Sequence, residues 1–410
     1  MNTRPIVTAG ALVVAALGCR DAGSPTEPAP VTPEATVTAV SALSFWQVSG
    51  GVEHTCGVTT NSLAYCWGWN ADGQLGLGST TGPESCPSPA GGSPCSATPV
   101  LVIGGHRFRQ VSAGAYYTCA VRTDSLAYCW GSNDGQLGDG TTTMRPSPVR
   151  VVGGHRFRQV DAGDSHTCGV ATDRKTYCWG WNRYGQLGDG TFTTRLSPVP
   201  VLGGYQFRLV TAGSGHTCGV TTANQVYCWG WNDYGQLGDS TTLSRRTRPR
   251  LVVGTRLYRL VEAGSYHTCA LTTTNRAYCW GKGEEGQLGF GKNYRSRWPR
   301  PVVGGLSFRR VTAGIYHTCG ETTTDRAYCW GSNTFGQLGD GTTTGRLIPV
   351  AVSGGLDFAQ VSAGGWHTCG KTSTAAGYCW GYNLFGQLGD GEGGYGQKSL
   401  MPVPVLGPMQ

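Results

Sequence analysis

Beyond its first 18 residues, the sequence lacks any segment with a sustained helical pattern of apolar residues. The apolar runs are short, rich in Val, Tyr, Trp and Phe, and bounded by Gly, Asn, Asp or Pro. A helical protein would need longer segments with a period of about 3.6 residues. Charged residues make up only 14% of the chain, and 66 residues are glycine. This composition is too apolar for disorder and too rich in turns for helices, so it indicates an all-β protein.

Catalytic motifs are also missing. The sequence contains no GxSxG nucleophile turn, no HExxH zinc motif and no SxDxGxTW Asp-box. Its carboxylates are sparse and do not recur at one spacing. We therefore expect a protein that is not an enzyme and that has no metal and no cofactor. A surface hydrolase with a site assembled from several segments stays an alternative.

No apolar run reaches the roughly 20 residues that a membrane span needs. The run from Ile6 to Leu17 follows Arg4 and has 12 residues, which is typical of a signal peptide. It ends in Ala16-Leu17-Gly18-Cys19, which resembles the bacterial lipobox except that the lipobox usually has Leu at the position of Ala16. The resemblance implies a signal peptide over residues 1–18, lipidation of Cys19, and a protein held at the periplasm or cell surface. An ordinary secretory signal is the alternative.

The segment 19–44 is dominated by Pro, Thr, Ala and Glu and has no apolar period. Such a composition is typical of a linker. As a flexible chain it would span about 25–30 Å root-mean-square. We expect it to hold a folded domain clear of the lipid head groups, with the membrane contacted through the lipid anchor only.

Cysteine is abundant, with 17 residues. A regular even set indicates disulfides and an oxidising compartment. Zinc sites need C-x2-C or Cys/His clusters, which are absent, so buried free thiols are the main alternative. The predicted bonds are seven C-x9-C pairs and one further pair: Cys56 with Cys66, Cys119 with Cys129, Cys168 with Cys178, Cys218 with Cys228, Cys269 with Cys279, Cys319 with Cys329, Cys369 with Cys379, and Cys86 with Cys95.

One stretch recurs along the chain. Residues 317–342 read HTCGETTTDRAYCWGSNTFGQLGDGT, and related copies begin at His54, Tyr117, His166, His216, His267 and His367. The copies lie about 50 residues apart, and each has about four short apolar segments. This pattern predicts a seven-bladed β-propeller of four-stranded blades over residues 45–407, with an insertion at about 78–97 in the first repeat. The two cysteines of each copy should lie opposite each other in a hairpin.

The pattern VxAGxxHTCxxT…xYCWGxNxxGQLGDGT resembles the regulator-of-chromosome-condensation repeat, which builds seven-bladed propellers. The resemblance covers nearly all of the chain beyond the linker. It implies, as one alternative function, nucleotide exchange on a small GTPase. The paired cysteines depart from the family's usual apolar residues and suit an exported member.

Two repeated features favour structure over binding. The histidines of the HTC motif recur once per blade, so a ring holds them too far apart to share a metal ion, and we expect each to hydrogen-bond a neighbouring turn. The GDGT segments lack the context of a phosphate loop and the alternating acids of a calcium loop. We interpret them as tight turns closed by the Asp side chain.

Binding residues are more plausible where the repeat varies. The two residues between AG and the His position should emerge on one face of the ring, and exposed aromatic rings there are favoured binding anchors. The candidates are Glu53, Tyr116, Asp164, Tyr266, Tyr316 and Trp366. A second variable set follows CWG and includes Trp69, Trp181, Trp231 and Tyr382. Both sets could instead pack on neighbouring blades.

Arginines cluster around residues 245–259, which would ordinarily suggest nucleic acid, but an exported protein argues against that partner. We interpret the chain as a non-catalytic scaffold at the bacterial cell envelope that binds a protein or a polysaccharide on one propeller face. Besides the exchange factor and the hydrolase, a secreted enzyme inhibitor is an alternative, because bacterial propellers similar to this one bind β-lactamases.

Overall fold

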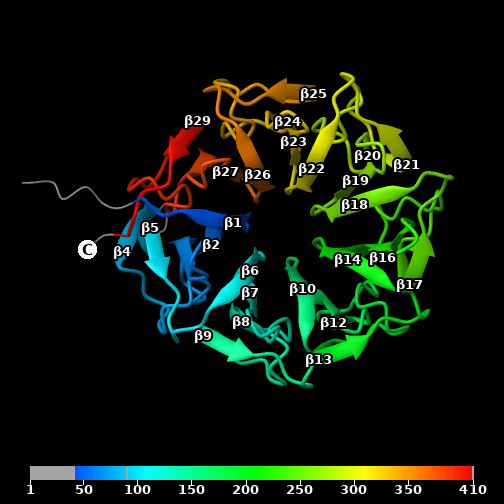
Figure 1. Cartoon of the computed structure of the whole chain (residues 1–410), viewed down its shortest axis with the longest axis horizontal. Helices are drawn as coiled ribbons and strands as arrows, with labels where there is room; N and C mark the ends of the chain where they lie inside the picture. The colour runs from blue at the N-terminus through cyan, green and yellow to red at the C-terminus, as the bar shows by residue number, and fades with distance from the viewer. Residues whose placement is uncertain (1–41, 89–90, 409–410) are drawn as a thin grey trace, which may run out of the picture. The chain divides into compact units, whose positions relative to one another are not determined.

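The computed structural model describes residues 42–88 and 91–408, which form a ring of seven antiparallel sheets (Figure 1). Each sheet comes from one repeat, and in six of the seven sheets the strands follow one another in chain order from the centre of the ring outward, while the first sheet has the order β1-β2-β3-β5-β4. Among these residues no helix is long and apolar enough to cross a membrane. The predicted all-β, seven-bladed propeller is confirmed. The predictions of a signal peptide and of lipidation at Cys19 concern residues outside the described part of the chain.

The seven blades share one strand plan. The innermost strands are β1 (Phe45–Gly50), β6 (Phe108–Ala113), β10 (Phe157–Ala162), β14 (Phe207–Ala212), β18 (Tyr258–Ala263), β22 (Phe308–Ala313) and β26 (Phe358–Ala363). The second strands are β2 (His54–Thr59), β7 (Tyr117–Arg122), β11 (His166–Ala171), β15 (His216–Thr221), β19 (His267–Thr272), β23 (His317–Thr322) and β27 (His367–Thr372).

The outer half of each blade completes the sheet. The third strands are β3 (Ala64–Trp69), β8 (Ala127–Gly131), β12 (Thr176–Gly180), β16 (Val226–Trp231), β20 (Ala277–Gly281), β24 (Ala327–Gly331) and β28 (Gly377–Tyr382). The fourth strands from the centre are β5 (Gly91–Leu101), β9 (Arg145–Arg150), β13 (Arg195–Pro200), β17 (Arg245–Leu251), β21 (Ser296–Pro301), β25 (Arg346–Ala351) and β29 (Lys398–Pro404).

The ring has two faces, which we name by the direction of the innermost strands. Each innermost strand begins at face B and ends at face A, where a two-residue turn leads into the second strand. The loop that carries GQLGDGT also lies on face A, because it follows the third strand, which runs parallel to the first. Face B carries the turns between second and third strands and the connections between blades.

The second strands are buried along almost their whole length, because each is sandwiched between two blades. Glycine in this strand has a packing reason. A Cβ atom built on Gly169 would lie 2.7 Å from Cδ1 of Phe157. The phenyl ring of the innermost strand therefore packs directly on the backbone of the second strand. The core of the protein consists of seven such layers between blades.

The seven C-x9-C pairs are disulfides that join the second and third strands of each blade. The bonded pairs are Cys56 with Cys66, Cys119 with Cys129, Cys168 with Cys178, Cys218 with Cys228, Cys269 with Cys279, Cys319 with Cys329, and Cys369 with Cys379. Cys168 lies directly opposite Cys178 in the strand register, with their Cα atoms 4.1 Å apart. All fourteen cysteines of these pairs are buried. The predicted hairpin pairing is thus confirmed, and the alternative of buried free thiols is wrong for these residues.

These bonds also add stability. Closing a loop of this length stabilises the fold by up to about 3 kcal/mol per bond in the chain-entropy model. Because every blade carries one such bond, the stabilisation is distributed around the whole ring.

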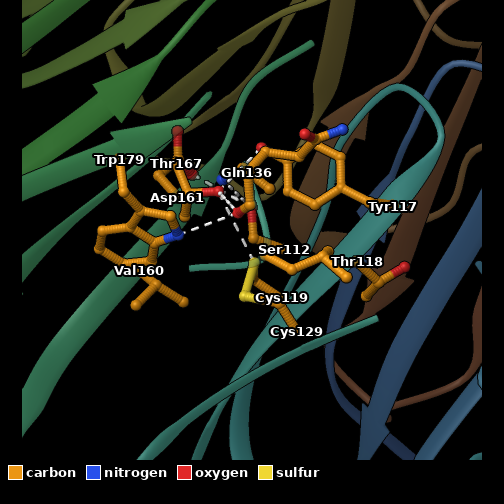
Figure 2. Close-up of a disulfide and its surroundings, with 12 residues drawn as sticks. Ser112, Tyr117, Thr118, Cys119, Cys129, Gln136, Val160, Asp161, Thr167 and Trp179 are labelled. Atoms are coloured by element: carbon orange, nitrogen blue, oxygen red, sulfur yellow. Dashed lines mark hydrogen bonds between the residues drawn. A yellow bond between two sulfur atoms is a disulfide. The ribbon is translucent and has the colours of Figure 1, made fainter. Parts of the chain in front are cut away.

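A cluster of hydrogen bonds at each blade boundary explains most of the repeated residues. Figure 2 shows the cluster between the second and third blades. The backbone oxygen of Gln136 accepts hydrogen bonds from the Thr167 hydroxyl at 2.8 Å and from the Trp179 indole at 2.9 Å. The Tyr117 hydroxyl lies 3.0 Å from the same threonine oxygen. Gln, Thr, Trp and Tyr thus form one buried junction from two blades.

The same junction recurs at the six other boundaries, with His in place of Tyr117. Imidazole Nε2 and threonine Oγ1 lie 2.7–2.9 Å apart. The prediction that each histidine bonds a neighbouring turn was therefore wrong. Its partner is the threonine of the next blade's HTC strand. Each second strand packs against the innermost strand of the next blade, as β11 does against β14, and the imidazole reaches past that strand to the threonine.

These contacts also fix the protonation of the histidines. Each threonine donates its only hydroxyl hydrogen to a backbone carbonyl, so the imidazole Nε2 must carry a hydrogen and donate it. The Nδ1 atoms of His267 and the five other repeat histidines are buried without a partner. A proton there would place a charge in a dry site. Burial accordingly lowers the pKa of His267 to about 3.

The ring closes without exchanging a strand. The last strand, β29, completes the seventh blade, and β1 starts the first. The boundary between these blades has the ordinary junction, with Thr55 Oγ1 lying 2.8 Å from His367 Nε2 and donating to the Gln387 oxygen at 2.9 Å. Phe45 also bonds through its backbone to Ala375. The closing boundary is therefore equivalent to the other six.

The first blade differs by one strand. Its extra residues form β4 (Glu84–Ser88), which pairs with a lengthened β5 and makes this sheet five-stranded. The predicted bond between Cys86 and Cys95 is present and joins these two strands. Both cysteines pack with Leu384 and Phe385 of the seventh blade. The insertion therefore bridges the first and last blades.

The buried histidines predict acid sensitivity. The pKa of His267 in the folded state, about 3, lies below its unfolded value of about 6.5, so its contribution is complete above pH 6.5 and is lost as the pH falls toward 3. In His267→Tyr, which copies Tyr117, we expect the free energy of unfolding to fall less steeply between pH 6 and 4, by about 1.4 kcal/mol per pH unit. Guanidinium titrations at several pH values measure this slope. An unchanged slope would show that His267 is not held neutral in the folded state.

Candidate functional site

The predicted face residues lie at the two-residue turns on face A. Tyr116 is the most open of them, with 41% of its surface exposed. Glu53, Asp164, Tyr266, Tyr316 and Trp366 are half-buried. Their aromatic rings are held by one another. The Tyr266 and Tyr316 rings stack with centroids 5.5 Å apart, and Tyr316 lies 5.3 Å from Trp366.

The second predicted set joins the first. The Trp231 ring meets Tyr266 edge-on at 5.8 Å, and Trp69 meets Tyr116 in the same way at 5.3 Å. The aromatic side chains of both sets therefore pack on neighbouring blades and are also partly exposed. The rings pack edge to face across blade boundaries and keep part of their surface open to solvent. Such contacts between rings add about 0.5–1.5 kcal/mol beyond burial and fix the orientation of each ring.

A third aromatic set was not identified from the sequence. Tyr184, Tyr234, Phe335 and Phe385 occupy the residue just before GQLG in four repeats, and each contacts a ring of the other sets. Aligning the repeats at this column would have found them. Together the three sets form a feature that we call the aromatic arc: Trp181, Tyr184, Trp231, Tyr234, Tyr266, Tyr316, Trp366, Phe335, Tyr382, Phe385, Trp69 and Tyr116.

A lysine sits in the middle of the arc. The Lys282 ammonium lies 5.5, 5.3 and 4.8 Å from the ring centroids of Tyr234, Tyr266 and Tyr316. Lys282 stands at the column where four other repeats have Trp or Tyr and two have Ser. A cation this close to three rings is attracted to each of them. The arc therefore already shows that it can hold a cationic side chain.

Carboxylates gather where the arc is interrupted, beside Tyr116. We call Glu53, Asp72 and Asp164 the acidic sector. Burial and then the carboxylates of Glu53, Asp164 and Asp72 raise the pKa of the Tyr116 hydroxyl. Burial, and next the charge of Asp72, raises the pKa of Glu53. These acids come from the first and third blades, so the sector combines negative charge from two repeats around one exposed ring.

Over residues 42–88 and 91–408, one group brings three candidate metal ligands together, namely Glu84, Cys86 and Cys95. Its two cysteines form a disulfide, so they have no thiolate to offer a metal.

The central channel is the other concave feature. Its narrow throat lies toward face A and is lined by the fifth residue of each innermost strand: Ser49, Ser112, Asp161, Thr211, Glu262, Thr312 and Ser362. Most of these side chains accept a backbone N–H of the next blade, as Asp161 does from Ala212 at 2.7 Å. Burial raises the pKa of Asp161 to about 6 and that of Glu262 to about 8. The throat acids thus help to join blades.

The channel widens toward face B into a cavity of about 710 Å³. Its wall carries Arg109, Arg158, Arg259, Arg309, Arg310 and Lys371. This basic lining was not predicted. The arginine cluster noticed at residues 245–259 does not form one patch, because Arg246 pairs with Asp239 at 2.9 Å while Arg259 lines the channel.

Comparison with known proteins identifies the repeat. A sequence model of the RCC1-like domain matches residues 3–308. Models of the regulator of chromosome condensation (RCC1) repeat match residues 324–370 and, for a second model, 308–337 and 358–387. The Arabidopsis thaliana ultraviolet-B receptor UVR8 is 32% identical over 108 residues, which are 25% of this chain and 21% of the receptor. The human probable E3 ubiquitin-protein ligase HERC6 is 32% identical over 107 residues, 25% of this chain and 9% of the ligase.

Solved structures share the fold at low sequence identity. Human WBSCR16 superimposes with a TM-score of 0.74 at 20% identity, covering 84% of this chain and 93% of its own. Prp20p from Saccharomyces cerevisiae, whose binding to Gsp1p and histones has been studied, gives 0.71 at 20% identity, covering 85% and 87%. The domain model matches well over half of the chain, and the seven blades extend the pattern to β29. The chain belongs to the RCC1-like domain family.

Proposed function

We propose that the protein is an exported, lipid-anchored, non-catalytic scaffold that binds a protein partner on face A. The observation that carries this proposal is the aromatic arc with the acidic sector at its break. Half-open rings supply contact area at low cost in side-chain entropy. Carboxylates beside Tyr116 favour a cationic side chain at the same place. The expected partner presents Lys or Arg residues among apolar ones.

The rigidity of the ring supports this role. The disulfides lock the second and third strands of every blade, and the junctions fix each blade on the next. The rings of the arc also hold one another in place. A partner would therefore bind a surface whose side chains are already ordered, which reduces the entropy cost of association. Protein binding also agrees with the behaviour of Prp20p, which binds Gsp1p and histones.

Eight disulfides indicate an oxidising, extracytoplasmic environment. This environment argues against nucleotide exchange on a small GTPase, because that activity implies a protein of the reducing cytosol or nucleus. An anchor at Cys19 and a position at the bacterial envelope are parts of our proposal that rest on the lipobox resemblance. A secreted inhibitor that uses face A against an enzyme is a special case of the same binding function.

Polysaccharide is the second candidate ligand, because stacked rings such as Tyr266 and Tyr316 also suit the apolar faces of sugars. The acidic sector favours a cationic protein over a neutral glycan. A hydrolase would need a pair of acids placed for catalysis, and no observation favours one.

The partner proposal predicts that face A variants lose binding. The double variant Tyr116→Ser with Trp366→Ala removes the ring beside the acidic sector and a second ring of the arc. We expect the amount of partner protein that it captures from an envelope extract to fall about tenfold or more. Quantitative mass spectrometry of the captured proteins measures this. The matched control is Leu257→Ser, which removes an apolar side chain, 50% exposed, from face B.

The result has clear readings. Equal capture by all three forms contradicts the assignment of face A. Proteins lost only from the double variant should be rich in Lys and Arg at their surfaces, and each should bind the purified chain directly. If an oligosaccharide array instead shows the only binding that is sensitive to the double variant, polysaccharide replaces protein as the ligand.

The anchor has its own test. We expect Cys19→Ser to release the protein from the membrane fraction into the soluble fraction and to abolish labelling by radioactive palmitate, because Cys19 would carry the acyl chains. Fractionation of the expressing cells measures both effects. Palmitate labelling that persists in Cys19→Ser would show that the anchor lies elsewhere.

A further inference from the structure

The basic cavity on face B is built by a repeated backbone feature. Each innermost strand has a register shift after its first residue, as between Phe157 and Gln159. A bulge of this kind re-aims the extra side chain. The residue at this bulge is arginine in five blades, namely Arg109, Arg158, Arg208, Arg259 and Arg309. In the first blade it is Trp46, which is 63% exposed.

The positive charge of these arginines is only partly compensated. Arg109 and Arg259 donate to backbone oxygens at the start of the next innermost strand, which are neutral groups. Arg309 makes the same contact but also forms an ion pair with the Asp325 carboxylate. Within the described part of the chain, the side chains of Arg158 and Lys371 make no hydrogen bond or ion pair, although both residues belong to strands. Burial, and next the positive charges of neighbouring arginines, lowers the pKa of Arg109 and of Lys371 below their ordinary values. The cations therefore repel one another.

Two blades add charges that the scaffold does not require. Arg310 stands where four other repeats have glutamine, and Glu321 lies directly opposite it in the strand register. Glu321 and Lys371 occupy a column that is Val or Leu in the five other repeats. The glutamines at the Arg310 column bridge blades, as Gln360 does to Val48 at 2.9 Å. In the sixth and seventh blades, charged side chains therefore replace the apolar side chains and blade-bridging glutamines that other blades have at the same level of the channel.

Glu321 is an unusual group for a protein interior. It is only 1% exposed and lines the cavity, and its Oε2 atom has no hydrogen-bond partner. Its Oε1 atom lies 3.9 Å from Arg310 Nε, which is the outer limit of an ion pair. Burial raises the pKa of Glu321 to about 7. Near neutral pH this carboxyl is protonated about half of the time, so it can donate a hydrogen bond to a ligand oxygen.

We propose that the face B end of the central channel binds a small multivalent anion, held by Arg158, Arg310 and Lys371 with Glu321 at its side. The ligand carries two or more phosphate or carboxylate groups. The cavity of about 710 Å³ has room for such a molecule, and six cationic side chains line it against three carboxyl groups. Guanidinium groups bind both kinds of anion in bidentate fashion. Trp46 stands at the rim, 5.8 Å from the Lys371 ammonium.

The site is separate from face A. The residues that line the cavity include none of the aromatic arc or the acidic sector, and throat residues such as Asp161 and Glu262 lie between the cavity and face A. Anion binding at face B therefore does not depend on the proposed partner binding at the aromatic arc, and either proposal can fail alone.

The test uses isothermal titration calorimetry of the folded, disulfide-bonded chain with inorganic pyrophosphate and with citrate, in about 0.15 M NaCl so that weak surface contacts are screened. We expect saturable binding of one anion per chain, with acetate binding too weakly to measure. Tighter binding of pyrophosphate would identify a phosphate ligand, and tighter binding of citrate a carboxylate ligand. Failure of both to bind overturns the proposal.

The decisive variant gives the sixth and seventh blades the uncharged residues that other blades have at the same positions. The triple variant Arg310→Gln, Glu321→Val and Lys371→Val replaces each charge with a residue found at the same column in other blades. We expect a melting temperature that is unchanged or higher, and an affinity weaker by roughly tenfold or more because charge-assisted hydrogen bonds are lost. Arg150→Gln on the outer strand β9 has the same change in net charge and should bind as the unaltered chain does.

A single substitution covers the case in which the triple variant misfolds. Arg158→Gln removes a guanidinium group that makes no hydrogen bond or ion pair with the described residues, so the fold should be unaffected. We expect this variant to bind the anion roughly fivefold or more weakly. Unchanged affinity in both Arg158→Gln and the triple variant, or an equal loss in Arg150→Gln, would show that the anion binds elsewhere by net charge alone, and would overturn the assignment.

Discussion

The structure depends on a shared acceptor, the backbone oxygen of the GQLG glutamine. At every blade boundary this oxygen accepts hydrogen bonds from a threonine and a tryptophan of the next blade. At six boundaries the threonine in turn accepts one from the histidine of the blade before, whereas Tyr117 lies beside Thr167 and donates to the His166 backbone oxygen. A buried junction of this kind is stable only when all its members are present. The repeated letters of the sequence are thus the parts of one contact made seven times.

The architecture could be predicted from the sequence because local spacing determines it. The interval between Cys168 and Cys178 matches the length of a hairpin, and a repeat of about 50 residues with four short strands matches the length of a propeller blade. The partner of His267 could not be predicted in the same way. It depends on which strands of adjacent blades face each other, and this follows from the curvature of the ring. Tyr117 alone hinted at the answer, since a phenol can replace a neutral imidazole but not a charged one.

The candidate sites were predicted in part for a similar reason. Tyr116, Tyr266, Tyr316 and Trp366 were found because they vary beside a fixed motif, and Tyr184 and Phe335 could have been found in the same way. Arg310, Glu321 and Lys371 vary too, but their meaning depends on a channel that exists only once the ring has closed. The comparison with other repeats separates the two kinds of residue. What all blades share holds the ring together, and what one or two blades alter is available for binding.

One consequence follows from the way the ring closes. Each sheet is made from one continuous piece of chain, and the boundary between the seventh and first blades uses the same junction as the rest. Phe45 and Val405, near the two ends of the described chain, pack in one cluster. The starting point of the polypeptide is therefore almost arbitrary. The fold would accommodate circular permutation at any connection between blades, because a cut there leaves every sheet intact and the old ends can be joined across the seam.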